Sequence, residues 1–142
     1  MNYQNEIETR PLPPIEIPRC EMILPMPRAW LEAVNRYSIN VESQLAGVVC
    51  DNNTLSLPAR EMQPNPRFKA RWDYFYRKPR VPSKPDATFC RAGGSIRTDI
   101  LRALEVCALQ INRSAHFLAL KIVAGSIEIQ QESERARTPS FL

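Results

Sequence analysis

The sequence predicts a small α+β protein in which a short N-terminal helix and small antiparallel strands pack against one long or two C-terminal helices. Three observations predict this class. Apolar residues recur with helical spacing between residues 96 and 134, aromatic and charged residues alternate over 67–77, and the ranges 28–57 and 86–138 contain no proline. Because the chain has 142 residues, we expect a single globular, oligomerising domain over 28–134.

Residues 1–27 are expected to form a proline-rich extended arm. Six of the 13 prolines fall within 11–27, and proline fixes φ and removes a backbone N–H donor, so such segments run extended. Isoleucines in the same segment make it too apolar for a purely solvated tail, so we expect the arm to pack along the body or onto a partner. The last residues, 135–142, are expected to form a flexible tail.

A short helix is expected directly after the arm, over 28–41. Trp30, Val34, Tyr37 and Val41 are spaced four, three and four residues apart, which places them on one helical face. The preceding proline suits the first position of a helix, where its missing N–H costs nothing.

Antiparallel strands are expected after this helix. The segments 44–50 and 54–57 flank an Asp-Asn-Asn sequence, a pattern typical of a hairpin turn. The alternation of aromatic and charged residues over 67–77 predicts a further strand with one aromatic face. The pair Gly93 and Gly94 is expected to form a turn that leads into the C-terminal helical region.

The C-terminal region contains apolar residues that recur alternately every three and four positions from 101 to 129. This heptad pattern is compatible with one long helix that packs against a second copy, or with two helices separated at 112–114, the second capped by Ser114. A hairpin of 118–123 with 127–131 is the third alternative. We assign the oligomer interface to these residues: Leu101, Leu104, Ala108, Ile111, Ala115, Leu118, Ile122 and Ile129.

Excess positive charge is confined to one segment. The chain has a net charge of +4, and the range 66–91 alone contains eight Lys or Arg against two Asp, together with six of the 11 aromatic residues. Arg and Lys neutralise phosphates, and exposed aromatic side chains stack on unpaired bases. The sequence therefore predicts a nucleic-acid-binding segment at 67–91 with these contact residues: Arg67, Lys69, Arg71, Trp72, Tyr76, Arg77, Lys78, Arg80, Lys84 and Arg91. A second interpretation places the aromatic residues in the core beneath an outward basic face.

Residues for the common kinds of catalysis are missing from the sequence. His116 is the only histidine, so a Ser-His-acid or Cys-His arrangement is disfavoured. The four cysteines form no Cys-x-x-Cys pair, and the sequence has no glycine-rich phosphate loop. We therefore expect no enzyme activity, no bound metal and no cofactor.

The sequence also lacks signals for membranes and export. No apolar run is long enough to span a membrane, and the N-terminus has neither the basic start nor the apolar stretch of a signal peptide. We therefore expect an intracellular protein, cytoplasmic or nuclear.

Together these patterns predict a non-catalytic nucleic-acid-binding protein, regulatory or accessory in role, that forms a homo-oligomer (dimer or larger) through helices at 96–134. The alternative is a structural or assembly subunit, scaffold or coat-like, of the kind found in viruses and mobile elements. In that alternative the arm and the long helix pack on neighbouring chains, and the basic segment meets an acidic protein surface.

Overall fold

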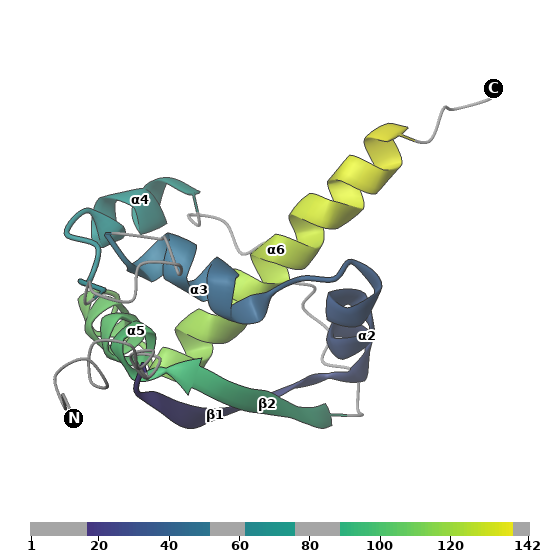
Figure 1. Ribbon diagram of the computed structural model, residues 1–142. Coiled ribbons are helices and arrows are strands. Elements are labelled where there is room, and N and C mark those ends of the chain that lie inside the picture. The colour runs from purple at the N-terminus through teal and green to yellow at the C-terminus, as the bar shows by residue number, and fades with distance from the viewer. Residues whose placement is uncertain (1–16, 52–61, 76–88, 138–142) are drawn as a thin grey trace, which may run out of the picture.

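The computed structural model describes residues 17–51, 62–75 and 89–137. Within these residues the α+β class and the C-terminal helices are confirmed. Residues 1–16 of the predicted arm (1–27), the segment 54–57 and most of the predicted tail lie outside the described residues, whereas residues 19–27 of the arm form a strand. The elements, in chain order, are β1 (Arg19–Pro27), α2 (Arg28–Arg36), α3 (Val41–Val49), α4 (Phe68–Phe75), β2 (Phe89–Arg97), α5 (Thr98–Gln110) and α6 (Ala115–Arg137) (Figure 1).

The two strands form an antiparallel ribbon along one side of the molecule (Figure 1). Each strand has nine residues, and they pair over their whole length, from Arg19 opposite Arg97 to Pro27 opposite Phe89. Side chains alternate between the two sides of a strand, so one face of the ribbon meets the helices and the other faces outward. Along β1 the inward side chains of Met22, Leu24 and Met26 are buried.

The chain repeats one structural unit, a strand followed by two helices. In the first unit β1 runs into α2 and α3, and in the second β2 runs into α5 and α6. The connection between the two helices has a residue in the left-handed region at the same place in both units, Ser38 with φ 52° and Asn112 with φ 54°. Such a residue ends a helix by turning the chain sharply after its last carbonyl groups.

The second helix of each unit also begins in the same way. The Asn40 side chain accepts a hydrogen bond from the Ser43 N–H at 3.0 Å, and Ser114 Oγ accepts one from the Phe117 N–H at 3.1 Å. Both contacts satisfy a backbone donor that the first turn of a helix leaves unpaired. The antiparallel pairing therefore relates two similar units by an approximate twofold axis through the centre of the ribbon.

The core lies between the inner face of the ribbon and the helices. Helix α6 is central to it, because it contacts α5, α3, α2 and β1 (Figure 1). Near the C-terminal end of α6, Glu134 pairs with Arg36 of α2, with 2.7 Å between Oε1 and Nη2. The largest fully buried side chains are Phe68, Met26, Leu45, Ile100, Leu104, Leu118, Ile122, Val49, Val123 and Cys107. Burial raises the pKa of the Cys107 thiol to about 11, so this thiol stays protonated at neutral pH.

Two predicted strands are helices. The segment predicted as a strand over 44–50 is mainly α3, whose buried Leu45, Ala46 and Val49 follow the spacing of a helix. The predicted aromatic strand over 67–77 contains α4, in which Phe68 and Trp72 lie one turn apart and face α5. Short apolar runs fit either structure by local pattern, and packing against α5 and α6 decides both cases.

The C-terminal region resolves in favour of two helices. The chain leaves α5 at Gln110 and begins α6 at Ala115, with Ser114 as the predicted cap. The hairpin alternative over 118–131 is wrong, because this range is helical throughout. The predicted helix over 28–41 is also shorter than expected, since α2 ends at Arg36 and Val41 begins the next helix.

The predicted turn at Gly93 and Gly94 is wrong, because both residues lie inside β2. A Cβ added at Gly93 would lie 2.5 Å from the carbonyl oxygen of Met22 and 2.8 Å from Cα of Ile23. Glycine at this position therefore allows the close approach of the two strands at the ribbon centre. A Cβ added at Gly94 would meet nothing within 4 Å.

These two glycines provide a matched test of the ribbon. We expect Gly93→Ala to lower the free energy of unfolding by about 1–3 kcal/mol, because the added methyl group overlaps the β1 backbone. Gly94→Ala should leave stability unchanged or raise it by up to about 1 kcal/mol, since it restricts the unfolded chain without a clash. Denaturant titration measures both values, and equal effects would contradict the close approach at Gly93.

Candidate nucleic-acid interface

The face of the ribbon that points away from the helices is exposed, and we call it the outer face. Every second residue of each strand contributes to it, and these residues face each other in pairs across the two strands. We define the outer face by its exposed residues: Arg19, Glu21, Ile23 and Pro25 from β1, and Arg91, Gly93 and Ser95 from β2. The outer face therefore combines a basic, an acidic, an apolar and a hydroxyl group within a strip two strands wide.

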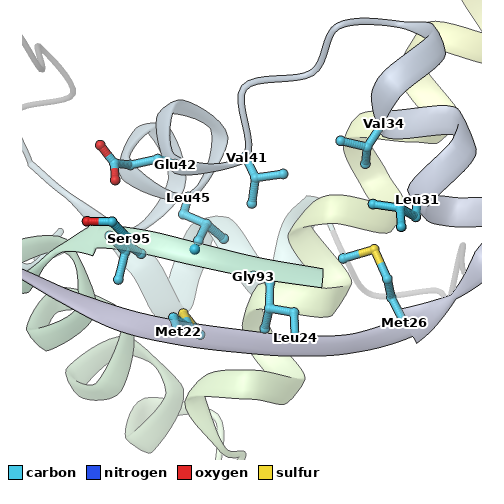
Figure 2. Close-up of a pocket in the computed structure, with 12 residues that line it drawn as sticks. Met22, Leu24, Met26, Leu31, Val34, Val41, Glu42, Leu45, Gly93 and Ser95 are labelled. Carbon is cyan, nitrogen blue, oxygen red and sulfur yellow. The ribbon is translucent and has the colours of Figure 1, made fainter. Parts of the chain in front are cut away.

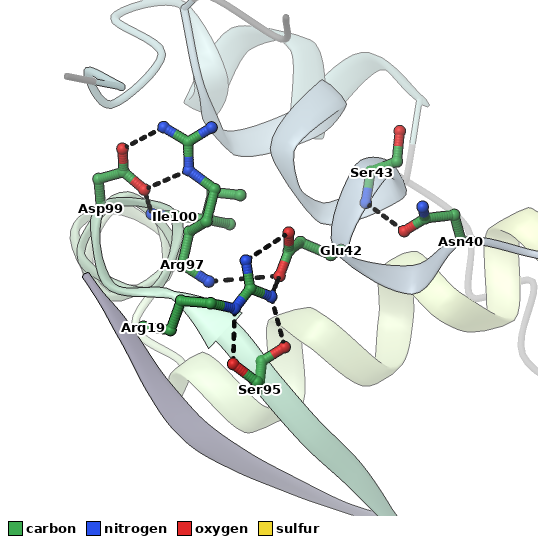
Figure 3. A network of polar contacts seen from close by, with 8 residues as sticks. All are labelled: Arg19, Asn40, Glu42, Ser43, Ser95, Arg97, Asp99 and Ile100. Carbon is green, nitrogen blue, oxygen red and sulfur yellow. Dashed lines mark hydrogen bonds and ion pairs between the residues drawn. The ribbon is translucent and has the colours of Figure 1, made fainter. Parts of the chain in front are cut away.

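At one end of the ribbon, Arg19 is fixed by a network of polar contacts (Figure 3). Its Nε donates a hydrogen bond to Ser95 Oγ at 2.6 Å, and its Nη2 donates to the Ser95 carbonyl oxygen at 2.9 Å. The same guanidinium forms an ion pair with Glu42, with 2.5 Å between Nη2 and Oε2. Because Glu42 lies in the first turn of α3, this network ties the ribbon to that helix.

A second ion pair lies where β2 continues into α5. The Arg97 side chain is only 3% exposed, and its Nε and Nη2 donate to the two carboxylate oxygens of Asp99 at 3.1 and 2.8 Å. The backbone N–H of Arg97 also donates to Glu42 Oε2 at 3.3 Å (Figure 3). The buried guanidinium therefore has a bidentate partner, as a buried charge requires.

Opposing influences set the pKa of Asp99. Partial burial alone would raise it, but hydrogen bonds from the Arg97 side chain and from the backbone N–H groups of Met62 and Ile100 lower it further than burial raises it. The net shift is below the ordinary value. Asp99 is therefore ionised at neutral pH and holds the start of α5 against the end of β2.

The centre of the outer face has side chains that are available for contacts. Within the described part of the chain, the side chains of Glu21 and Arg91 form no hydrogen bond or ion pair, and both residues are exposed. Ile23 is 37% exposed, a high value for a large aliphatic side chain in a sheet. The carboxylate can accept hydrogen bonds, the guanidinium can donate them, and Ile23 offers an apolar contact.

A cavity of about 240 Å³ lies behind the ribbon, on the side of the first unit (Figure 2). Met22, Leu24 and Met26 project into it from β1, and Leu31 and Leu45 close it from α2 and α3 (Figure 2). The lining is nearly all apolar. The polar exceptions are Glu42 and Ser95, and both already contact Arg19. The cavity is therefore mainly an apolar packing defect behind the ribbon.

The predicted nucleic-acid contacts are distributed over two separate surfaces. Arg91 lies on the outer face, whereas Arg67, Lys69, Arg71 and Trp72 lie in α4 or directly before it. Figure 1 shows α4 on the opposite side of the body from the ribbon, with α3 and α5 between them. The remaining predicted contacts, Tyr76, Arg77, Lys78, Arg80 and Lys84, lie outside the described residues.

Helix α4 uses Phe68 and Trp72 for packing, whereas its Tyr74 is exposed. The Trp72 ring stacks on buried Phe68 with 5.6 Å between ring centroids, and Trp72 is half-buried. Lys69 forms an exposed ion pair with Asp73 at 3.8 Å. The core interpretation of these aromatic residues therefore fits Phe68 and Trp72 better than base stacking does.

The predicted oligomer interface is largely part of the protein's own core. Leu104, Ala108, Leu118 and Ile122 are buried within the chain, so its own packing accounts for the heptad pattern there. Three other predicted interface residues are partly buried: Leu101, Ile111 and Ala115. Ile129 is exposed. An interface between two copies of the chain stays a prediction. Ile129 is the predicted interface residue that is available for it.

Sequence reasoning missed Arg19, Glu21, Ile23 and Ser95 as candidate site residues. A signal was present between Arg19 and Pro27, because Cys20, Met22, Leu24 and Met26 are apolar at every second position, and the first residues of the other set, Arg19 and Glu21, are charged. Two prolines in that range hid the signal, since proline usually argues against a strand. Both prolines are tolerated because a two-stranded ribbon consists of edge strands, where one side of each backbone has no partner strand.

Comparison with known proteins does not assign the chain to a family. No protein-family model, curated protein or solved structure matches the chain. Among the described residues no helix combines the length and the apolar character needed to cross a membrane.

The Arg97–Asp99 pair predicts a specific acid sensitivity. Because the pKa of Asp99 is lower in the folded state, its ionised form stabilises the fold at neutral pH. This contribution is lost as the pH falls below about 4, through the folded-state pKa. We expect Asp99→Asn to cost about 3 kcal/mol at pH 7, since it leaves the Arg97 charge buried without its partner, and to flatten the loss of stability in acid.

The matched control is Asp73→Asn, which removes the carboxylate of an exposed helical ion pair. We expect it to change the free energy of unfolding by no more than about 0.5 kcal/mol. Denaturant titrations between pH 3 and pH 7 compare the two variants with the parent chain. Similar values for Asp99→Asn and Asp73→Asn would rule out a structural role for the buried pair.

Proposed function

We propose that this protein binds duplex DNA by placing the outer face of its β-ribbon in the major groove. The observation that carries the proposal is the ribbon itself, an isolated pair of nine-residue strands with one face exposed and the other backed by helices. A two-stranded β-ribbon is one of the two kinds of element that the major groove of B-DNA admits.

The dimensions support this placement. Paired strands lie about 4.8 Å apart, so two strands with their side chains fit a groove about 12 Å wide. Nine residues in an extended strand span about 30 Å, which is close to one turn of the double helix. The helices of both units stand behind the ribbon, so they would remain outside the groove (Figure 1).

The side chains on the outer face are of kinds that recognise base edges. A guanidinium such as that of Arg91 can donate two hydrogen bonds to guanine, and a carboxylate such as that of Glu21 can accept one from the cytosine amino group. Ile23 and Pro25 offer apolar surface to thymine methyl groups. Because both charged side chains are free of intramolecular partners within the described residues, no existing ion pair would have to break on binding.

Duplex DNA is favoured over single strands for a structural reason. Recognition of single strands depends on exposed aromatic side chains that stack on bases, and none of the described side chains on the outer face is aromatic. Trp72, one of the two stacking candidates from the sequence, is stacked on Phe68 and lies on α4, away from the ribbon. The other candidate, Tyr76, lies outside the described residues.

Binding can be tested with fluorescent oligonucleotides. A duplex enriched from a random pool should bind more tightly than either of its separate strands, and its affinity should fall steeply with salt as counterions are released. Arg91→Ala should weaken binding about tenfold or more, since a bidentate contact to a base is worth about 1–3 kcal/mol.

Arg135→Ala is the control, because Arg135 is exposed near the far end of α6 (Figure 1). It removes the same charge from a surface away from the ribbon and should weaken binding far less. An equal loss for both variants would indicate a general charge effect, and an unchanged affinity of Arg91→Ala would move the site away from the outer face.

A further inference from the structure

We propose that one chain alone reads a non-palindromic DNA site, because the two halves of its outer face carry opposite chemistry at equivalent positions. This inference rests on the proposed function and specifies its substrate. The first step is that the ribbon is complete within a single chain, since β1 and β2 come from the two units of the same polypeptide. A second copy is not needed to form the surface that enters the groove.

The second step is the equivalence of positions in the two units. Ile23 pairs with Gly93 at the centre of the ribbon, so the approximate twofold axis passes between them. Glu21 lies two residues before Ile23, and Arg91 lies two residues before Gly93. The axis therefore exchanges the positions of Glu21 and Arg91. One of these equivalent positions has a carboxylate, and the other has a guanidinium.

Other equivalent positions differ as well. Two residues beyond the centre, β1 has Pro25 and β2 has Ser95, so an apolar ring corresponds to a hydroxyl group. At the centre a branched aliphatic side chain corresponds to a glycine. The backbone of the ribbon is nearly symmetric, but its exposed chemistry is not.

The third step concerns the DNA. A palindromic site presents the same base edge at positions related by its twofold axis. Guanine offers two acceptors in the major groove, which suit Arg91 but would face the carboxylate of Glu21 with like partial charge. Cytosine offers an amino donor, which suits Glu21 but would face the guanidinium. A palindrome therefore satisfies one half of the outer face and opposes the other.

In the preferred site, Glu21 consequently contacts a cytosine on one DNA strand. Arg91 contacts a guanine at the equivalent position, on the DNA strand that faces it. Selection of the full-length chain from a randomised duplex library tests this. We expect an asymmetric motif, bound by one chain per duplex, as measured by the mass of the complex. The selected duplex should bind at least tenfold more tightly than either palindrome built from one of its halves.

A charge reversal tests the assignment to Glu21. Glu21→Arg makes the two equivalent positions alike, so repeated selection should now yield guanine at both positions. Glu32→Arg is the matched control, because it makes the same charge change on an exposed residue of α2 and should leave the motif asymmetric. Arg91→Glu is a second variant, which should yield cytosine at both positions, and thermal unfolding verifies that each variant is folded.

The outcomes separate this inference from the proposed function. A palindromic motif for the parent chain, two chains per site, or an unchanged motif in Glu21→Arg and Arg91→Glu would overturn the inference. Tight duplex binding without any sequence preference would also overturn it while leaving DNA binding in place. Failure to bind any duplex would overturn both.

Discussion

The pairing of β1 with β2 is the interaction on which the rest of the structure depends. It joins strands that begin 70 residues apart in the chain and pairs them over their full length. Because each strand continues directly into a helix, the pairing also sets where α2 and α5 begin. The cost of closing such a long loop is repaid by a core that neither unit could form alone, since α6 of the second unit packs against α2 and α3 of the first.

The two units contribute unequally to that core. Helix α5 buries five side chains, whereas α2 has none that is fully buried. The apolar cavity lies on the same side, under α2 and α3. The buried side chains of β1 and α3 are supplemented by polar contacts between the units, in which Arg19 donates to Ser95 and the backbone N–H of Arg97 donates to Glu42. Charge-assisted hydrogen bonds are directional, so they fix the orientation of the ribbon where apolar packing is sparse.

The fold class could be predicted from the sequence, and the break before Ser114 was one of the alternatives it left open, because helical periodicity and capping are local properties. The ribbon could not, since its partner strands are far apart and Pro25 and Pro27 disguised the first of them. The candidate site was harder for a related reason. A search for a continuous basic segment pointed to 67–91, but a ribbon face takes every second residue from two distant segments. Of the described residues in that prediction, Arg91 alone lies on the outer face.

The internal repeat has a consequence for how such a surface can change over generations. When two identical chains build a symmetric surface, every substitution appears twice, and a change that suits one half is imposed on the other. Here each half is encoded separately, so a mutation at Glu21 leaves its counterpart Arg91 untouched. Selection can therefore act on one half at a time while the other half retains its contacts. Each mutational step is then smaller than in a symmetric dimer, and more routes to a new specificity remain open.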